Sequence, residues 1–375
     1  MAIYLDHAAT SPMPPEVRAA YVDALAIVGN PSSIHGHGQA ARDLLETARE
    51  GIAASLGADS VEVVLTGGGT ESVNLAIKGT YWARSPRRRI LTTRAEHHAT
   101  LDSVAWLEAH EGAVIDFLDV DAAGRLSLDS LERALAEPDD VALVTALWAN
   151  NEVGTLQPVA DIVRLAHAAG VPVHLDAIAA YGSVPVHVHE VGADLVSVSA
   201  HKIGGPVGIG ALVVSRTATV EPLLHGGDQQ RTRSGTQDAA GAVAFAAAAA
   251  LIPATAEALA AVRDRLRDGL AALPGVTLRG ARDDRLPGNV HATFAGTDGD
   301  ALLYLLDRAG FSVSTGSACQ AGVAEVSHVL LAMGVPADEA RGALRFTLGA
   351  ETTPAEIDAL LAVLPDVLAQ ARAAS

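Results

Sequence analysis

Three side chains of this sequence are suited to covalent chemistry: Lys78, Lys202 and Cys319 are its only lysines and its only cysteine. Lys202 ends the run Ser199-Ala-His-Lys, which follows a predicted strand and precedes a glycine-rich stretch. An amine held there can form a Schiff base with an aldehyde. The alternative is a surface lysine on a glycine-rich hairpin. The scarcity of lysine, in a chain with 26 Lys and Arg residues, favours the first interpretation.

Two further groups follow predicted strands. Residues 66–72 form a glycine-rich turn that opens a helix, where backbone N–H groups can hold a phosphate, although a plain tight turn explains this pattern equally well. Asp176 follows a strand expected to be buried on both faces, and such an acid requires a cation or a protonated ring nitrogen as its partner. An amine, a phosphate cradle and an acid at one sheet edge match the needs of pyridoxal 5'-phosphate (PLP).

These groups need a scaffold that brings strand ends together. From Val61 to about Ser215, short β-branched runs alternate with amphipathic segments, a pattern typical of a parallel sheet covered by helices. The expected strands are Val61–Leu65, Arg89–Thr93, Val114–Leu118, Val141–Trp148, Val171–Leu175, Leu195–Ser199 and Gly210–Val214. Expected helices include Ser72–Gly79, Thr100–Ala109 and Pro158–Ala169. Ligands of such sheets bind beyond the carboxyl ends of the strands.

The pattern changes after Pro253 to a long charged helix and then to strands and helices of a smaller α+β unit. We therefore expect an α/β fold with a mostly parallel sheet and flanking helices in a large domain, residues 15–253. Residues 1–14 and 254–375 are expected to form the small α+β domain. The uncharged run Ala239–Ile252 is too short for a membrane span, which needs about 20 apolar residues, and predicts a buried helix.

Composition excludes several classes of protein. A net charge of -18 with 3% aromatic residues argues against direct binding of nucleic acid and against anionic membrane surfaces. The amino terminus has Asp6 before any apolar run and lacks the basic start of a signal peptide. A single cysteine cannot form an intramolecular disulfide. These features predict a cytoplasmic protein, and no cluster of side chains predicts a metal site.

Two residues in the last third of the chain are candidates for a site. Cys319 lies in a loop of Gly, Ser and Ala residues, which favours an accessible thiol over a buried inert one. Arg345 lies inside an apolar, strand-like segment and needs a carboxylate partner there. That partner is either a substrate or a structural Asp or Glu.

Taken together, the motifs resemble the cysteine desulfurases of the NifS/IscS type, which are PLP enzymes of fold type I in the class-V aminotransferase group. The resemblance extends nearly from end to end of the chain. Its motifs are Tyr4–Thr10, Gly29–Ser33, Gly68–Ser72, Glu96-His97, Asn150–Gly154, Ser199–Lys202, Arg233–Thr236, Gly316–Cys319 and Arg345-Phe346.

The resemblance implies a role for each matching residue in the cofactor site. Lys202 would hold PLP and carry the substrate proton, His97 would stack on the ring and assist acid-base steps, and Asp176 would pair with the ring nitrogen. The phosphate would be bound by Gly69, Thr70, Ser199 and His201, with Thr236 reaching in from the second subunit of a homodimer. Asn151 is also expected beside the cofactor.

The resemblance also implies the reaction. Asn151 and Arg345 would bind the carboxylate of L-cysteine, and the thiolate of Cys319 would attack the substrate sulfur. The products would be L-alanine and a persulfide, which passes to an acceptor or scaffold protein for iron-sulfur cluster assembly, tRNA thiolation or another pathway. The stretch after Cys319 is not shortened, like that of family members with a long cysteine loop.

The sequence departs from the family pattern at two places. Ala179 stands where the family has a glutamine that donates a hydrogen bond to the phenolic oxygen of the cofactor, and the loop 225–233 carries Asp228 in place of a glycine. These changes leave two alternatives open. One is another PLP reaction on the same scaffold, such as that of a selenocysteine lyase or a transaminase, and the other is a weakly active sulfur-relay partner.

Overall fold

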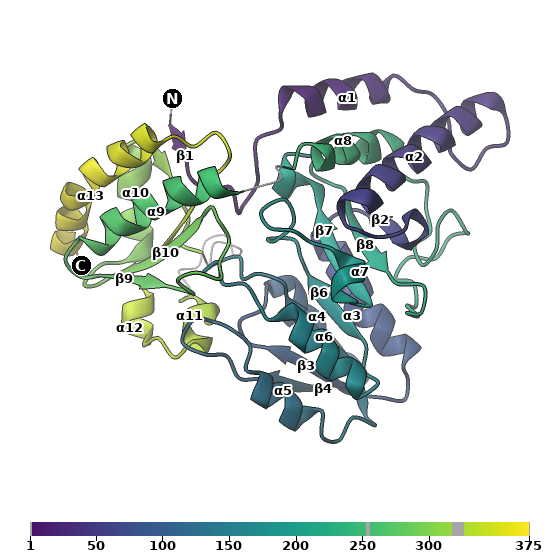
Figure 1. Ribbon diagram of the computed structural model, residues 1–375, viewed down its shortest axis with the longest axis horizontal. Helices are drawn as coiled ribbons and strands as arrows, with labels where there is room; N and C mark the ends of the chain where they lie inside the picture. Colours follow the sequence, from purple (N-terminus) through teal and green to yellow (C-terminus); the bar gives the residue numbers. More distant parts are fainter. Residues whose placement is uncertain (1, 253–255, 317–325, 375) are drawn as a thin grey trace.

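The structure is a computed structural model that describes residues 2–252, 256–316 and 326–374. A seven-stranded sheet and a three-stranded sheet lie side by side, and helices cover both (Figure 1). Each sheet contributes to its own cluster of buried hydrophobic side chains. The α/β class predicted from the sequence is confirmed.

The large sheet has the strand order β2-β8-β7-β6-β5-β3-β4. Five of its strands, β3 to β7, run parallel, whereas β8 is antiparallel to both of its neighbours. All seven residues of β5 are buried, and all but Thr145 are apolar, as expected in a parallel sheet that is covered on both faces. The strands are β2 (Val63–Thr66), β3 (Arg89–Thr93), β4 (Val114–Leu118), β5 (Val141–Leu147), β6 (Val173–Asp176), β7 (Leu195–Ser199) and β8 (Gly210–Val214).

The bounds of β2, β5 and β6 differ from the expected ranges by one or two residues at one end or both, and two of these differences bear on the site. β2 begins at Val63, because Ser60–Glu62 form a short 3-10 turn in which the side chain of Glu62 accepts a hydrogen bond from the N–H of Asp59. β6 extends one residue further than expected, so that Asp176 is the last residue of the strand and not the first residue of the loop. The backbone of Asp176 is therefore held by the sheet.

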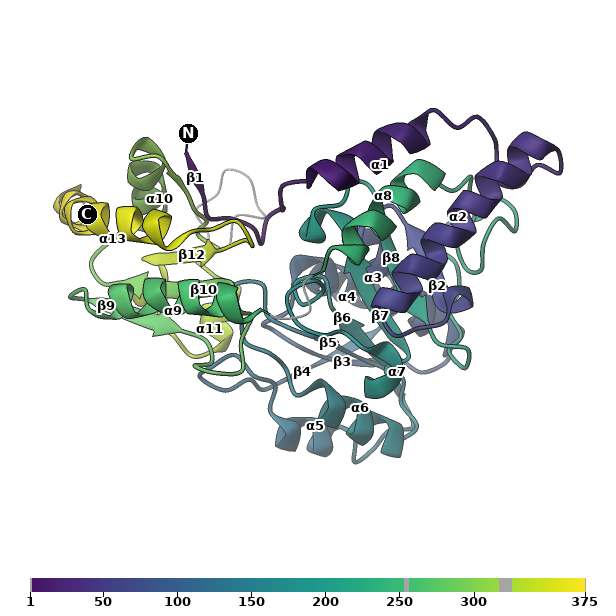
Figure 2. The same ribbon diagram turned by 45° about the horizontal axis from the view of Figure 1, so that its top comes forward.

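Helices cover both faces of the large sheet, and the amino-terminal pair α1 and α2 pack on α8 (Figure 2). Alanine makes up most of α8, and a Cβ on Gly51 of α2 would lie 3.4 Å from that of Ala246, so the two helices approach to within van der Waals contact of such small side chains. The helices are α1 (Pro15–Leu25), α2 (Gly36–Ser55), α3 (Gly69–Ala83), α4 (His98–Glu111), α5 (Leu128–Ala134), α6 (Val159–Ala168), α7 (Val188–Val191) and α8 (Ala239–Ala250).

The small sheet has the order β12-β10-β9 and is antiparallel. Beside it, β1 (Ile3–Tyr4) pairs in parallel with β11 (Phe311–Ser312), so the amino terminus packs with the carboxy-terminal third of the chain. The remaining elements are α9 (Glu257–Ala271), β9 (Val276–Arg279), β10 (Asn289–Phe294), α10 (Gly299–Arg308), α11 (His328–Ala332), α12 (Ala337–Ala340), β12 (Ala343–Thr347) and α13 (Pro354–Ala374).

The boundary expected between residues 253 and 254 lies outside the described residues, so the division into two domains at these positions stays a prediction. Among the helices that the structure describes, none combines the length and the apolar character that crossing a membrane requires.

Candidate active site

A cavity of about 700 Å³ lies between the two sheets. The carboxyl ends of β6 and β7, the start of α3 and β12 contribute to its wall, together with the amino-terminal segment 6–15. Most of the residues that the sequence suggested for a site lie on this wall. They are Gly69, Thr70, His97, Asn151, Asp176, Ser199, His201, Lys202 and Arg345.

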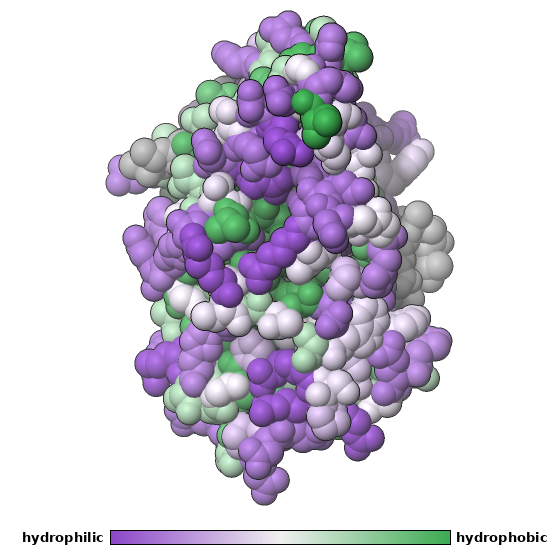
Figure 3. Space-filling model, turned by 90° about the vertical axis from the view of Figure 1, so that its right-hand side faces the viewer, coloured by the Kyte–Doolittle hydropathy of each residue, from purple (hydrophilic) through white to green (hydrophobic). Residues whose placement is uncertain are grey.

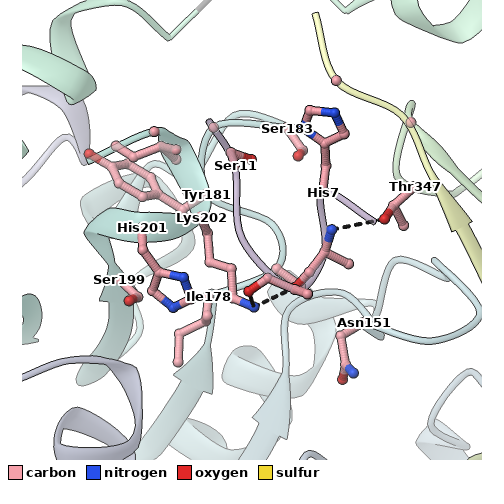
Figure 4. A pocket seen from close by; sticks show the side chains of 18 of the residues that line it. His7, Ser11, Asn151, Ile178, Tyr181, Ser183, Ser199, His201, Lys202 and Thr347 are labelled. Atoms are coloured by element: carbon pink, nitrogen blue, oxygen red, sulfur yellow. Dashed lines mark hydrogen bonds between the residues drawn. The ribbon is translucent and has the colours of Figure 1, made fainter. Parts of the chain in front are cut away.

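Lys202 reaches the cavity from the 3-10 turn Ala200–Ile203, which directly follows β7. Gly204 ends this turn in the left-handed region, with φ of 81°, where a side chain would be strained. The Nζ atom of Lys202 donates hydrogen bonds to the backbone oxygens of Ala8 and Ala9, the latter at 3.0 Å (Figure 4). The amine therefore points into the space between the large sheet and the amino-terminal segment.

Asp176 is 2% exposed on the same wall. Burial raises the pKa of its carboxyl to about 6, and the opposing effects of a hydrogen bond from the Ile178 N–H and of the Lys202 charge are smaller. The Ile178 N–H donates to Asp176 Oδ1 at 3.0 Å. A cationic ring nitrogen in the cavity would supply a partner for the negative charge of this buried carboxylate.

The part of the cavity wall at the start of α3 has the properties of a phosphate-binding site. α3 begins at Gly69, so its first N–H groups have no partners within the helix and carry the positive end of the helix dipole. Ser199 Oγ is buried and has no hydrogen-bond partner among the described residues. A Cβ atom on Gly69 would collide with Cδ1 of Ile178, so a larger residue there would force the Ile178 side chain to move. The cradle, Lys202 and Asp176 together fit PLP.

His97 lies at the amino terminus of α4, where its Nδ1 accepts a hydrogen bond from the Ala99 N–H at 3.0 Å. The capping role considered from the sequence therefore exists, and the ring also lines the cavity. Burial lowers the pKa of His97 to about 4, with a smaller contribution from the charge of Lys202. The ring is neutral at pH 7, and because Nδ1 is an acceptor, its hydrogen lies on Nε2.

Arg345, on β12, is the main cation of the opposite wall. Its Nη1 donates to the backbone oxygen of Asn151 at 3.1 Å, and its Nη2 donates to Asp6 Oδ1 at 2.8 Å. Asp6 is a functional candidate that the analysis of residue types and spacing missed, since 339 positions separate it from Arg345. Two features of the sequence indicated this pair indirectly, the need of Arg345 for an acid and the position of Asp6 inside the motif Tyr4–Thr10.

Two predicted site residues are not among those that line the cavity. Thr236 is exposed, in the loop that precedes α8. Cys319 lies outside the described residues, although Ser314 and Gly316, which precede it in the chain, line the cavity. Ala179 also lines the cavity, where it offers no side-chain donor, whereas Asp228 is exposed in the loop 225–233.

Comparisons with known proteins agree with this geometry. The family model described as aminotransferase class-V matches residues 3–360. An IscS-like cysteine desulfurase of Mycobacterium tuberculosis is 52% identical, with coverage of 99% of this chain and 98% of the relative. A cysteine desulfurase IscS of Dictyoglomus turgidum is 41% identical, with 100% and 96% coverage.

Solved structures give the same result. A NifS-like protein superposes with a TM-score of 0.91 at 33% identity and covers 98% of this chain and 100% of its own. A NifS-like protein from Rickettsia africae has a TM-score of 0.88 at 31% identity, with 98% and 99% coverage. The chain therefore belongs to the class-V aminotransferase family, in which it is a PLP-dependent enzyme with the fold of the NifS/IscS-type cysteine desulfurases.

Proposed function

We propose that this protein converts L-cysteine to L-alanine and transfers the sulfur to Cys319, and from there to an acceptor protein. The observation that carries the proposal is the convergence of Lys202, Asp176 and Arg345 on one cavity between the two sheets. The amine of Lys202 can react with the aldehyde of PLP, and the buried acid Asp176 can pair with the ring nitrogen. Arg345 can bind a substrate carboxylate. The names of the full-length relatives support the same reaction.

Bound PLP supplies an electron-withdrawing ring that stabilises negative charge on the α-carbon of an amino acid. The charge of Asp176 favours the protonated form of the ring nitrogen, since the burial that raises the pKa of this carboxyl makes a cationic partner more valuable. The Nζ atom of Lys202 would take the α-proton and return it, and Ser199, His201, Gly69 and Thr70 would hold the phosphate.

His97 contributes as a neutral ring. Its Nδ1 is engaged by the Ala99 N–H, so its free hydrogen, on Nε2, is available for donation toward the cavity. The low pKa of His97, about 4, keeps this tautomer across the physiological pH range. We assign stacking and hydrogen-bond donation to His97 and the movement of the α-proton to Lys202.

Arg345 and Asn151, which both line the cavity, bind the substrate carboxylate. The Cys319 thiolate then attacks the substrate sulfur. A sulfur–sulfur bond forms, the carbon–sulfur bond breaks, and its electron pair remains on the substrate carbon, which takes up a proton to become the methyl group of L-alanine. Cysteine and enzyme thiol thus give alanine and enzyme persulfide, with atoms and electrons balanced.

We also propose that two copies of the chain form a homodimer. The end of α1 and the loop after it expose several large apolar side chains, and hydrophobic areas interrupt the hydrophilic surface on this side of the molecule (Figure 3). Thr236 is exposed outside the cavity of its own chain, as expected of a residue that serves the phosphate site of a second copy. The exposed apolar residues are Val22, Leu25, Ile27, Val28 and Ile34.

The pathway that receives the sulfur, whether iron-sulfur cluster assembly or tRNA thiolation, and the cytoplasmic location stay predictions from the sequence. The same holds for the domains, which we assign to residues 15–253 and to residues 1–14 with 254–375.

The proposal is tested by measuring alanine release from L-cysteine by the PLP-reconstituted protein in the presence of a thiol reductant. We expect the parent to form alanine. Cys319→Ser is expected to keep the visible absorption of the bound cofactor but to lose at least about 99% of the rate, because a hydroxyl cannot accept sulfur. Equal sulfur transfer by the two proteins would exclude Cys319 as the acceptor. Bound cofactor without alanine release by the parent would favour another substrate or a relay role.

A further inference from the structure

The guanidinium of Arg345 has an environment that its proposed role does not explain. The side chain is 6% exposed, and each of its two Nη atoms already has a partner within the protein. One partner is the neutral backbone oxygen of Asn151, and the other is the carboxylate of Asp6. Asp6 is the only acid that forms an ion pair with Arg345 among the described residues.

A buried cation requires a permanent counter-charge. A substrate carboxylate cannot serve in that role, because it leaves with every turnover. The side chain of Arg345 is also long and flexible, so two contacts at separate nitrogens are needed to fix the plane of its fork. Asp6 meets both needs: it neutralises the charge throughout the catalytic cycle and fixes Nη2, while Asn151 fixes Nη1.

Asp6 is itself held from two sides. On the small-sheet side, its backbone forms a bridge with Thr347 of β12, and Thr347 Oγ1 accepts a hydrogen bond from the Ala8 N–H at 2.8 Å. On the large-sheet side, the Ser11 N–H donates to the backbone oxygen of His201 at 3.0 Å, a contact that does not use the amine of Lys202. The segment 6–11 thus spans the cavity from the arginine to the lysine.

We propose that Asp6 is a positioning residue that orients Arg345 for the α-carboxylate of the substrate and thereby gives the site its preference for amino acids over simple amines. This inference rests on the proposed function, since it assigns the carboxylate to Arg345. It predicts that the loss of Asp6 weakens the binding of ligands that carry a carboxylate and leaves the binding of amines that lack one unchanged.

The test compares Asp6→Ala and Asp6→Asn with the parent, all as dimeric, PLP-loaded protein. We expect the KM for L-cysteine to rise about tenfold in Asp6→Ala, which corresponds to roughly 1.4 kcal/mol of binding free energy, with kcat changed less than about twofold. Asp6→Asn keeps the shape and an acceptor oxygen, so we expect a smaller rise. Asp358→Asn is the matched control, because it breaks the exposed pair of Asp358 with Arg265.

A second readout does not require desulfuration. Isothermal titration calorimetry with L-alanine should give the same loss of affinity in Asp6→Ala, whereas cysteamine, an amine and thiol without a carboxylate, should bind as tightly as to the parent. A loss for both ligands would mean a general structural role and would overturn the proposal. Because L-alanine binding is measured directly, the test remains decisive even for a parent that forms no alanine from cysteine.

The coupling between the two residues is tested by a double-mutant cycle. In an Arg345→Lys background, Asp6→Ala should cause little further loss of L-alanine affinity, since the fork that Asp6 orients is already absent. Additive losses would show that Asp6 acts independently of Arg345. An unchanged or lowered KM in Asp6→Ala alone would show that Asp6 competes with the substrate for Arg345, which is the opposite of positioning.

Discussion

The two walls of the cavity are built in different ways. The wall from the large sheet carries Asp176, Ser199 and Lys202, each within a few residues of the end of a strand. The wall from the small sheet carries Arg345 in the middle of β12, and its partner Asp6 comes from the opposite end of the chain. The first wall depends on local connections within a parallel sheet, whereas the second depends on long-range contacts, so cofactor binding and substrate binding should be separable by mutation.

Cofactor binding and substrate binding should be separated most clearly by comparing Lys202→Ala with Arg345→Lys. Lys202→Ala should abolish the visible absorption of protein-bound PLP and reduce alanine formation by at least about 10³-fold, because the nucleophilic amine is lost. Arg345→Lys should keep the absorption and raise the KM for L-cysteine about 30-fold, because a point charge replaces a bidentate fork and about 2 kcal/mol is lost. Absorption spectra and steady-state kinetics measure both.

Lys78→Ala is the control for Lys202→Ala, since it removes the other lysine of the chain, whose Nζ lies 4.5 Å from the centre of the Trp106 ring. This variant should keep the absorption and the activity. If the cofactor absorption band survives in Lys202→Ala and disappears in Lys78→Ala, then Lys78 and not Lys202 binds PLP.

Asp176→Asn should have two smaller effects of opposite sign: it should stabilise the cofactor-free protein and lower the activity of the PLP-loaded protein. The pKa of Asp176 is raised to about 6 in the folded protein, so its burial costs nothing below the unfolded pKa, and stability falls as the pH rises through about 4 to 6. Above that range, Asp176→Asn should stabilise the cofactor-free protein by up to about 3 kcal/mol, and at pH 4 by little. Urea unfolding at pH 4 and pH 8 measures this.

With PLP bound, Asp176→Asn should instead lower kcat about 10²-fold, because the ring nitrogen loses its anionic partner. A stabilised protein that has lost activity would confirm that this acid is kept for chemistry and not for folding. Equal stability of parent and variant at pH 8 would contradict the raised pKa.

The smallest effect is expected from Ala179→Gln, on the large-sheet wall. A glutamine there gains one neutral hydrogen bond, worth about 0.5–1.5 kcal/mol, so the Kd for PLP should fall about two- to tenfold. The pH dependence of the cofactor band should shift as well, while the KM for L-cysteine stays the same. A change in the KM for L-cysteine without a change in the cofactor absorption band would show that residue 179 affects substrate binding and not cofactor binding.

The same contrast between walls explains what the sequence could predict. β-branched runs separated by helical segments located β3 to β7 to within about two residues, and the carboxyl-end rule then placed Asp176, Ser199 and Lys202 on one cavity. No local pattern could pair Asp6 with Arg345, because that contact depends on the packing of β1 beside β11. The expectation of a mostly parallel sheet is confirmed, but the apolar run of β8 did not indicate which strand would be antiparallel.

The position of β1 has a consequence for folding during synthesis on the ribosome. Residues 3–8 are synthesised long before their partners Phe311, Arg345 and Thr347. The large sheet, β2 to β8, can assemble earlier, because its strands all precede residue 215. The amino-terminal segment cannot complete its contacts until β12 has been translated, so a product that ends before β12 would contain the lysine wall but no finished cavity.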